Sequence, residues 1–117
     1  MESIRAIVAL SALGQETRLE IFRLLVRNTP EGLPAGEIAR RLEVPQNTMS
    51  SHLGLLTRAG LLTSERFSRS IVYKVDLDAF RELMLFMVKD CCNGNATLCA
   101  PLIAELTPCC QPQEVIQ

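Results

Sequence analysis

The stretch that decides the fold runs from Leu33 to Leu62 and reads LPAGEIARRLEVPQNTMSSHLGLLTRAGLL. Its first part places Ile38, Ala39 and Leu42 on one apolar face of a helix predicted over residues 35–42. Pro45 follows, and because proline lacks a backbone N–H it fits a turn or the first position of a new helix. The stretch therefore predicts two short helices joined by a tight turn.

The second predicted helix begins at Pro45 and separates an apolar face from a polar one. Met49, Leu53 and Leu56 recur at four- and three-residue intervals and form a stripe that we expect to be buried. The opposite face carries amide and hydroxyl side chains, which can bond to the base edges and phosphates of DNA. The candidate DNA-binding residues on this helix are Gln46, Asn47, Thr48, Ser50, Ser51 and Arg58. An ordinary amphipathic helix with a solvated polar face is the alternative.

Two strand-like runs follow the second helix directly. Gly60 suits the left-handed position that ends a helix, and β-branched and aromatic residues are concentrated in the second run. Residues 62–67 and 70–75 therefore predict a β-hairpin, with Arg66 and Arg69 near its tip. A basic hairpin after such a helix pair is typical of a wing. The sequence predicts a mainly α-helical fold with a β-hairpin wing, a winged helix-turn-helix that binds double-stranded DNA.

The charge distribution agrees with this prediction, although the net charge of the whole chain is only −1. Residues 35–75 carry six basic side chains against three acidic ones, a local charge of +3. Residues 1–34 are balanced, and residues 76–117 carry a charge of −4. The positive charge is thus concentrated in the predicted DNA-contacting segment.

Two helical segments are more apolar than a monomer of this size needs. Residues 4–13 form one of them, and in the helix predicted for residues 79–90, seven of the nine residues from Phe80 to Val88 are large and apolar. A helix that is hydrophobic all round must be covered on several sides. We expect a homodimer formed through these N-terminal and C-terminal helices, matching a pseudo-palindromic operator. A further helix is predicted between Gln15 and Arg27.

The chain of 117 residues is expected to form one domain with an appended segment. Residues 1–92 would hold the DNA-binding and dimerisation domain, and residues 93–117 a cysteine-containing segment with a flexible tail. No apolar run is long enough to cross a bilayer, and no signal pattern is visible at the N-terminus. We therefore expect a cytoplasmic protein with no membrane partner.

All five cysteines lie in the last part of the chain: Cys91, Cys92, Cys99, Cys109 and Cys110. The Asn-Gly-Asn turn at residues 93–95 can reverse the chain, so that Cys99 approaches Cys91 and Cys92 and three thiolates converge on one soft ion. Three alternatives stay open: small buried apolar residues, disulfides and a structural zinc site. The odd count and cytosolic reduction disfavour disulfides, and the spacing lacks the paired pattern of zinc sites.

An enzymatic function is not expected from this sequence. A cysteine-based phosphatase or arsenate reductase would need an arginine six residues after its nucleophile, and none follows Cys91, Cys92 or Cys99 at that spacing. There is no glycine-rich phosphate loop. The single histidine, His52, lies in the predicted DNA-reading helix beside its apolar stripe, where packing or DNA contact is the expected role.

Four segments together resemble the ArsR/SmtB family of metal-sensing winged-helix repressors: QETRLEIFRLL from Gln15, PQNTMSSHL from Pro45, RAGLL from Arg58, and the wing ending Val72-Tyr73. The resemblance covers about residues 3–92. Cys91 and Cys92 after Asp90, with Gly94 and Cys99 beyond, resemble the subgroup that senses trivalent arsenic just after the dimer helix.

This resemblance implies that the unliganded dimer binds its operator as a repressor. It further implies that As(III), or Sb(III), acts as inducer by binding Cys91, Cys92 and Cys99, which releases the DNA and derepresses resistance genes. Cys109 and Cys110 are expected to be spectators. The chain lacks the Cys-x-Cys that the better-known arsenic site places on the first DNA-adjacent helix, and Pro45 replaces the serine common before the reading helix.

Two other functions remain open on the same residues. A thiol redox sensor would use the winged-helix scaffold but switch by disulfide formation. A metal-sequestering protein would use the cysteines without regulating transcription.

Overall fold

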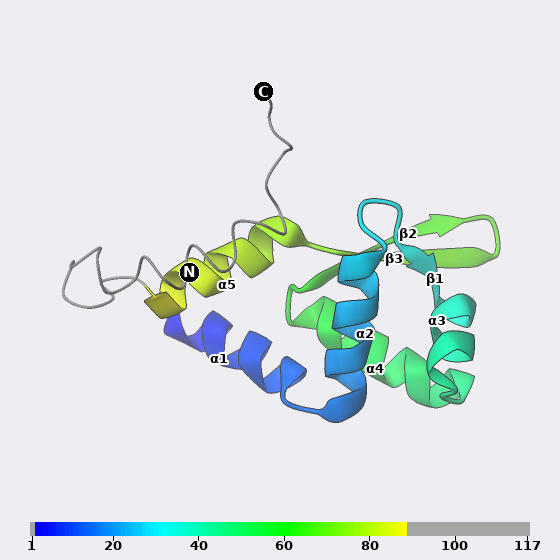
Figure 1. Ribbon diagram of the computed structural model, residues 1–117, viewed down its shortest axis with the longest axis horizontal. Coiled ribbons are helices and arrows are strands. Elements are labelled where there is room, and N and C mark those ends of the chain that lie inside the picture. The colour runs from blue at the N-terminus through cyan, green and yellow to red at the C-terminus, as the bar shows by residue number, and fades with distance from the viewer. Residues whose placement is uncertain (1, 89–117) are drawn as a thin grey trace, which may run out of the picture. The chain divides into compact units, whose positions relative to one another are not determined.

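The computed structural model describes residues 2–88, which form a mainly helical fold with a small antiparallel sheet (Figure 1). In chain order the elements are α1 (Ser3–Leu13), α2 (Glu16–Arg27), β1 (Leu33–Pro34), α3 (Ala35–Leu42), α4 (Gln46–Arg58), β2 (Leu62–Phe67), β3 (Ser70–Val75) and α5 (Leu77–Val88). The predicted winged helix-turn-helix is confirmed, with α3 and α4 as the helix pair and β2 and β3 as the wing.

The fold is described here for the compact unit Met1–Phe86. The boundary predicted between residues 92 and 93 lies outside the described residues.

Local capping explains where the helices begin and end. The side chain of Gln15 accepts a hydrogen bond of 2.9 Å from the backbone N–H of Arg18, which makes Gln15 the N-cap of α2. Asp76 Oδ1 accepts one of 3.0 Å from the N–H of Ala79. The segment Asp76–Asp78 was expected to cap this helix, and Asp76 does so, but the helix starts at Leu77 and not at the predicted residue 79.

Helices α3 and α4 are each followed by a residue in the left-handed backbone conformation. Glu43 ends α3 with a φ of 56°, and Gly60 follows α4 with a φ of 87°. Gly60 was expected at such a position because glycine has no Cβ to collide with the backbone. Its left-handed turn directs the chain from α4 into the first strand of the wing.

The sheet has the strand order β1-β3-β2 with antiparallel pairing throughout. The wing register runs from the pair Leu62 and Val75 to the pair Phe67 and Ser70, which leaves a two-residue turn at the tip. The sequence did not predict β1, because two residues show no periodicity and one of them is Pro34. Proline is tolerated there since β1 is an edge strand.

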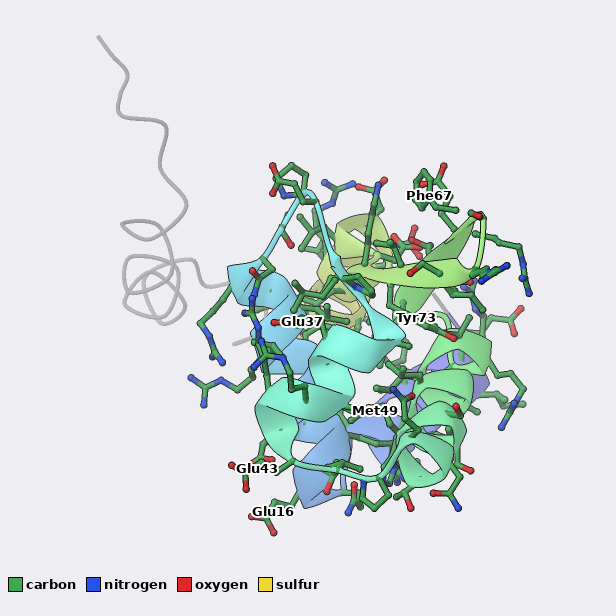
Figure 2. All side chains as sticks on the ribbon, turned by 90° about the vertical axis from the view of Figure 1, so that its right-hand side faces the viewer. Glu16, Glu37, Glu43, Met49, Phe67 and Tyr73 are labelled. Carbon is green, nitrogen blue, oxygen red and sulfur yellow. The ribbon has the colours of Figure 1, made fainter. Side chains whose placement is uncertain are left out.

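The core of this unit lies beneath α4. The side chains of Met49, Leu53 and Leu56 are all 0% exposed, which confirms the predicted apolar stripe. Figure 2 shows Met49 between α3 and α4. Helix α5 is tied to α2 by the rings of Phe22 and Phe80, whose centroids are 5.0 Å apart. The apolar side of α4 is thus fully packed into the core, which leaves its polar side at the surface.

Candidate nucleic-acid interface

The first half of α4 presents its polar residues to solvent. All five predicted side chains there are exposed, whereas Met49 in the same segment is fully buried: Gln46, Asn47, Thr48, Ser50 and Ser51. The structure therefore brings these candidates together on one accessible helix face, backed by a packed apolar stripe.

The hydrogen bonds at the start of α4 show which polar groups remain available. Pro45 is the N-cap and offers no side-chain hydrogen bond. Asn47 Oδ1 instead accepts a bond of 2.9 Å from the N–H of Thr48. This local bond uses the carbonyl oxygen of Asn47 and leaves its NH₂ group as a donor, which matches the acceptors on base edges and phosphates.

Gln46 and Arg58 lie somewhat apart from the centre of this face. The Gln46 amide reaches back to α3, since its Nε2 would be 3.4 Å from a Cβ placed on Gly36. Arg58 is about three turns further along α4, where its Nη1 would be 3.3 Å from a Cβ on Gly54. Asn47 and Ser51 therefore form the centre of the face, and Arg58 lies apart from them at the C-terminal end of α4.

The wing carries the other predicted contacts. Arg66 and Arg69 are exposed at its tip, and the positive φ of 57° at Ser68 makes the two-residue turn between the strands. Phe67, between the two arginines, is 52% exposed and lies at the outer end of the wing in Figure 2. Sequence reasoning missed Phe67 because an aromatic residue in a strand is normally read as core. Its position next to the turn is the sequence feature that could have predicted its exposure.

Ion pairs reduce the positive charge that the sequence count suggested. Glu37 accepts hydrogen bonds from Arg40 and from Arg41, the latter at 2.6 Å. The bond from Arg40, followed by that from Arg41, lowers the pKa of Glu37 to about 2. Lys74 Nζ lies 3.7 Å from Glu65 Oε1. These pairs engage three of the six basic residues.

The remaining basic residues are those predicted to contact DNA. Among residues 2–88, no salt bridge involves Arg58, Arg66 or Arg69. The pairs that Glu37 forms could be predicted from the sequence, because residues three and four apart are neighbours on a helix and Arg40 and Arg41 follow Glu37 at those spacings. The interface is therefore basic mainly at the wing tip and at the end of α4.

The predicted thiolate ligands Cys91, Cys92 and Cys99 lie outside the described residues. Within residues 2–88, no group of three or more His, Cys, Asp or Glu side chains is arranged to hold a metal ion. Over that same part of the chain, none of the helices combines the length and the apolar character that a bilayer crossing requires.

Helix α1 has an unusual distribution of side-chain size. Its small residues Ala6, Ala9 and Ala12 are the buried ones, at 2%, 1% and 1% exposure. Its large residues point outward, with Ile4 at 73% and Ile7 at 64% exposure. An amphipathic helix that served only its own monomer would show the reverse. Helix α5 also exposes large apolar residues, and both helices lie at the end of this unit opposite the wing (Figure 1).

Together, the helix pair, the polar face of α4 and the wing define a winged helix-turn-helix protein, and comparisons with known proteins agree. A family described as a helix-turn-helix domain matches residues 13–65. The transcriptional activator HlyU of Vibrio cholerae is 30% identical over 93 residues, spanning 80% of this chain and 83% of that protein. The solved structure of that HlyU gives a TM-score of 0.59 at 33% identity, over 74% of this chain and 97% of the HlyU chain.

Two further solved structures have the same fold. An ArsR-like transcriptional regulator from Rhodococcus sp. RHA1 gives a TM-score of 0.67 at 26% identity, over 83% of this chain and 89% of that one. The homodimeric winged helix-turn-helix DNA-binding domain of Mb0332 from Mycobacterium bovis gives 0.60 at 26% identity, over 72% and 76% of the two chains. This chain belongs to the family of winged helix-turn-helix transcriptional regulators of the ArsR/HlyU type.

Proposed function

We propose that the protein is a homodimeric transcriptional regulator that binds operator DNA and releases it when its C-terminal thiols capture As(III). The observation that carries DNA binding is the split on α4: a fully buried apolar stripe behind a face of five exposed, short polar side chains. Asn47 and Ser51 read base edges in the major groove, while Arg58 and the wing arginines bind phosphates.

Dimerisation is supported by α1. Its large side chains Ile4, Ile7 and Val8 recur on one face and are 73%, 64% and 47% exposed. A second copy of the same helix, together with α5, is the cover that a two-fold interface offers. The related Mycobacterium bovis domain is homodimeric. Two-fold symmetry places two α4 helices on successive half-sites, about 34–36 Å apart.

The arsenic response is proposed from the chemistry of the donors. Thiolates are soft ligands, and three of them on one side satisfy As(III), which keeps a lone pair on the other. Cys91, Cys92 and Cys99 are the nearest set after α5, and Sb(III) has the same preference. A protein of the same fold, 25% identical to this chain, is named a possible transcriptional regulator for arsenical resistance. Capture of the ion releases DNA only if the site binds it more tightly in the released state.

Thiol oxidation is the second candidate, and one observation favours it. A solved structure of the Vibrio cholerae HlyU relative is described as the reduced protein, at 31% identity to this chain and a TM-score of 0.58. In this alternative, two cysteine thiols lose two protons and two electrons to an oxidant such as hydrogen peroxide, which becomes water, and a disulfide forms. In both cases the regulator works in the cytoplasm, where the thiols start reduced.

The two candidates separate in one binding experiment. The reduced full-length protein is titrated onto a duplex of its own upstream DNA, with arsenite or with hydrogen peroxide, and binding is followed by fluorescence anisotropy. We expect arsenite to release the wild type and the Cys110→Ser control, while Cys99→Ser stays bound at the same arsenite concentration.

The other outcomes each contradict one proposal. Release by peroxide alone refutes the arsenic response and supports the redox function. Arsenite release of Cys99→Ser refutes the assignment of that ligand. If the reduced protein shows no salt-sensitive binding to any duplex, DNA regulation itself is wrong and metal sequestration takes its place.

A further inference from the structure

The side chain of Arg18 joins three helices that carry different parts of the proposed function. Its Nε donates a hydrogen bond of 2.6 Å to the carbonyl of Ala12, in the last turn of α1. Its Nη1 lies 3.4 Å from Nδ1 of His52 on α4. The backbone N–H of Arg18 is itself fixed by the N-cap Gln15 at 2.9 Å.

This arrangement fixes the protonation of His52. A guanidinium has donors and no acceptor, so Nδ1 of His52 must accept, and its proton sits on Nε2. Burial, and after it the charge of Arg18, lowers the pKa of His52. A protonated ring would carry a hydrogen on both nitrogens and face a second cation at the same distance. The contact therefore exists only with neutral His52.

We propose that Arg18 is a positioning residue that sets the orientation of the reading helix α4 relative to the dimer helix α1. It reaches both helices through one rigid, planar group, so the spacing of the two reading helices in the dimer depends on it. This inference rests on the proposed DNA-binding dimer and adds to it the link between the interface and the reading face.

The sign of the pH dependence of operator binding distinguishes positioning by Arg18 from a simple effect of charge on His52. His52 is the only histidine in the chain, and among the described residues Arg18 is the charged group that acts on it. The group that α1 contributes to this contact is the backbone carbonyl of Ala12, which is uncharged. Adding a positive charge to a DNA-binding surface normally strengthens binding to the polyanion. If Arg18 positions α4, protonation of His52 breaks the contact and weakens operator binding, which is the opposite sign.

The test compares Arg18→Gln with Arg23→Gln, a matched loss of one positive charge from the exposed side of the same helix. Operator affinity is measured by fluorescence anisotropy from pH 7.5 to 5.5. At pH 7.5 we expect Arg18→Gln to bind about 2- to 30-fold more weakly than Arg23→Gln. The wild type and Arg23→Gln should weaken as the pH falls, whereas Arg18→Gln and His52→Asn, which lacks a titrating ring, should not.

A second measurement does not depend on DNA. The titration of His52, followed by NMR in the full-length protein, should show a higher pKa in Arg18→Gln than in the wild type. Sedimentation and urea unfolding check that the variant remains a folded dimer. If the wild type binds no duplex, the proposed function fails. If it binds and Arg18→Gln matches Arg23→Gln in affinity and pH profile, or if wild-type binding strengthens at low pH, the positioning role is refuted.

Discussion

Truncation of Ile7 tests the dimer interface most sharply, because the structure gives its expected magnitude. Ile7 is 64% exposed on α1, so about two thirds of the free energy of burying an isoleucine is still to be gained. Full burial is worth about 1.5–3 kcal/mol, which leaves about 1–2 kcal/mol per subunit. Both subunits change in a symmetric dimer, so Ile7→Ala should weaken dimerisation by about 2–4 kcal/mol, or about 30- to 800-fold.

Sedimentation equilibrium of the reduced full-length protein over a range of concentrations measures this constant. Alanine is a better helix former than isoleucine, so the monomer should not unfold. Phe67→Ala is the control, since Phe67 is 52% exposed but lies at the wing tip. A dimerisation constant for Ile7→Ala equal to that of Phe67→Ala, or a monomeric wild type, would refute the argument.

Three further changes test the reading surface and its support. Glu37→Gln should strengthen non-specific duplex binding and steepen its salt dependence by up to about one unit, because Arg40 and Arg41 lose their carboxylate partner. The pKa of Glu37 is lowered from 4.5 to about 2, so its contribution to folding stability should be present above pH 4.5 and disappear as the pH falls through 2. Urea unfolding of the wild type and of Glu37→Gln across this pH range measures that contribution. Gly32→Ala should lower the free energy of unfolding in urea by about 2–4 kcal/mol, and Gly60→Ala by about 1 kcal/mol. Both glycines have a positive φ, but only a Cβ on Gly32 would meet the Tyr73 carbonyl. Equal losses would contradict this. Met49→Ala should cost about 2–5 kcal/mol, since Met49 is 0% exposed, and a cost under 1 kcal/mol would show that α3 and α4 do not depend on it.

The elements that were predicted well are those with a repeating pattern and a clear end signal. The bounds of α3 and of both wing strands agree with the prediction, since Ile38, Ala39 and Leu42 mark one helix face and Gly60 marks an exit. The start of α5 was missed by two residues, because the side chain that caps a helix depends on local geometry that the apolar pattern does not give. Strand β1 was missed because its two residues pair only through the position of β3.

The candidate site was predictable in composition but not in its connections. The exposure of Asn47 and Ser51 follows from helical spacing relative to Met49. The link from Arg18 to His52 does not, because it joins residues far apart in sequence whose meeting depends on how α1, α2 and α4 pack. The half-exposed Phe67 was missed for a different reason: an aromatic residue in a strand is normally buried, although its place beside the turn favours exposure.

Sequence-specific binding by α4 is measured by the ratio of affinities for the operator and for a shuffled duplex. Replacing Asn47 and Ser51 together by alanine should lower this ratio roughly 5- to 150-fold, the discrimination carried by one good base contact, while binding to the shuffled duplex persists through the arginines. A ratio equal to that of the wild type would show that these two side chains do not read the operator sequence.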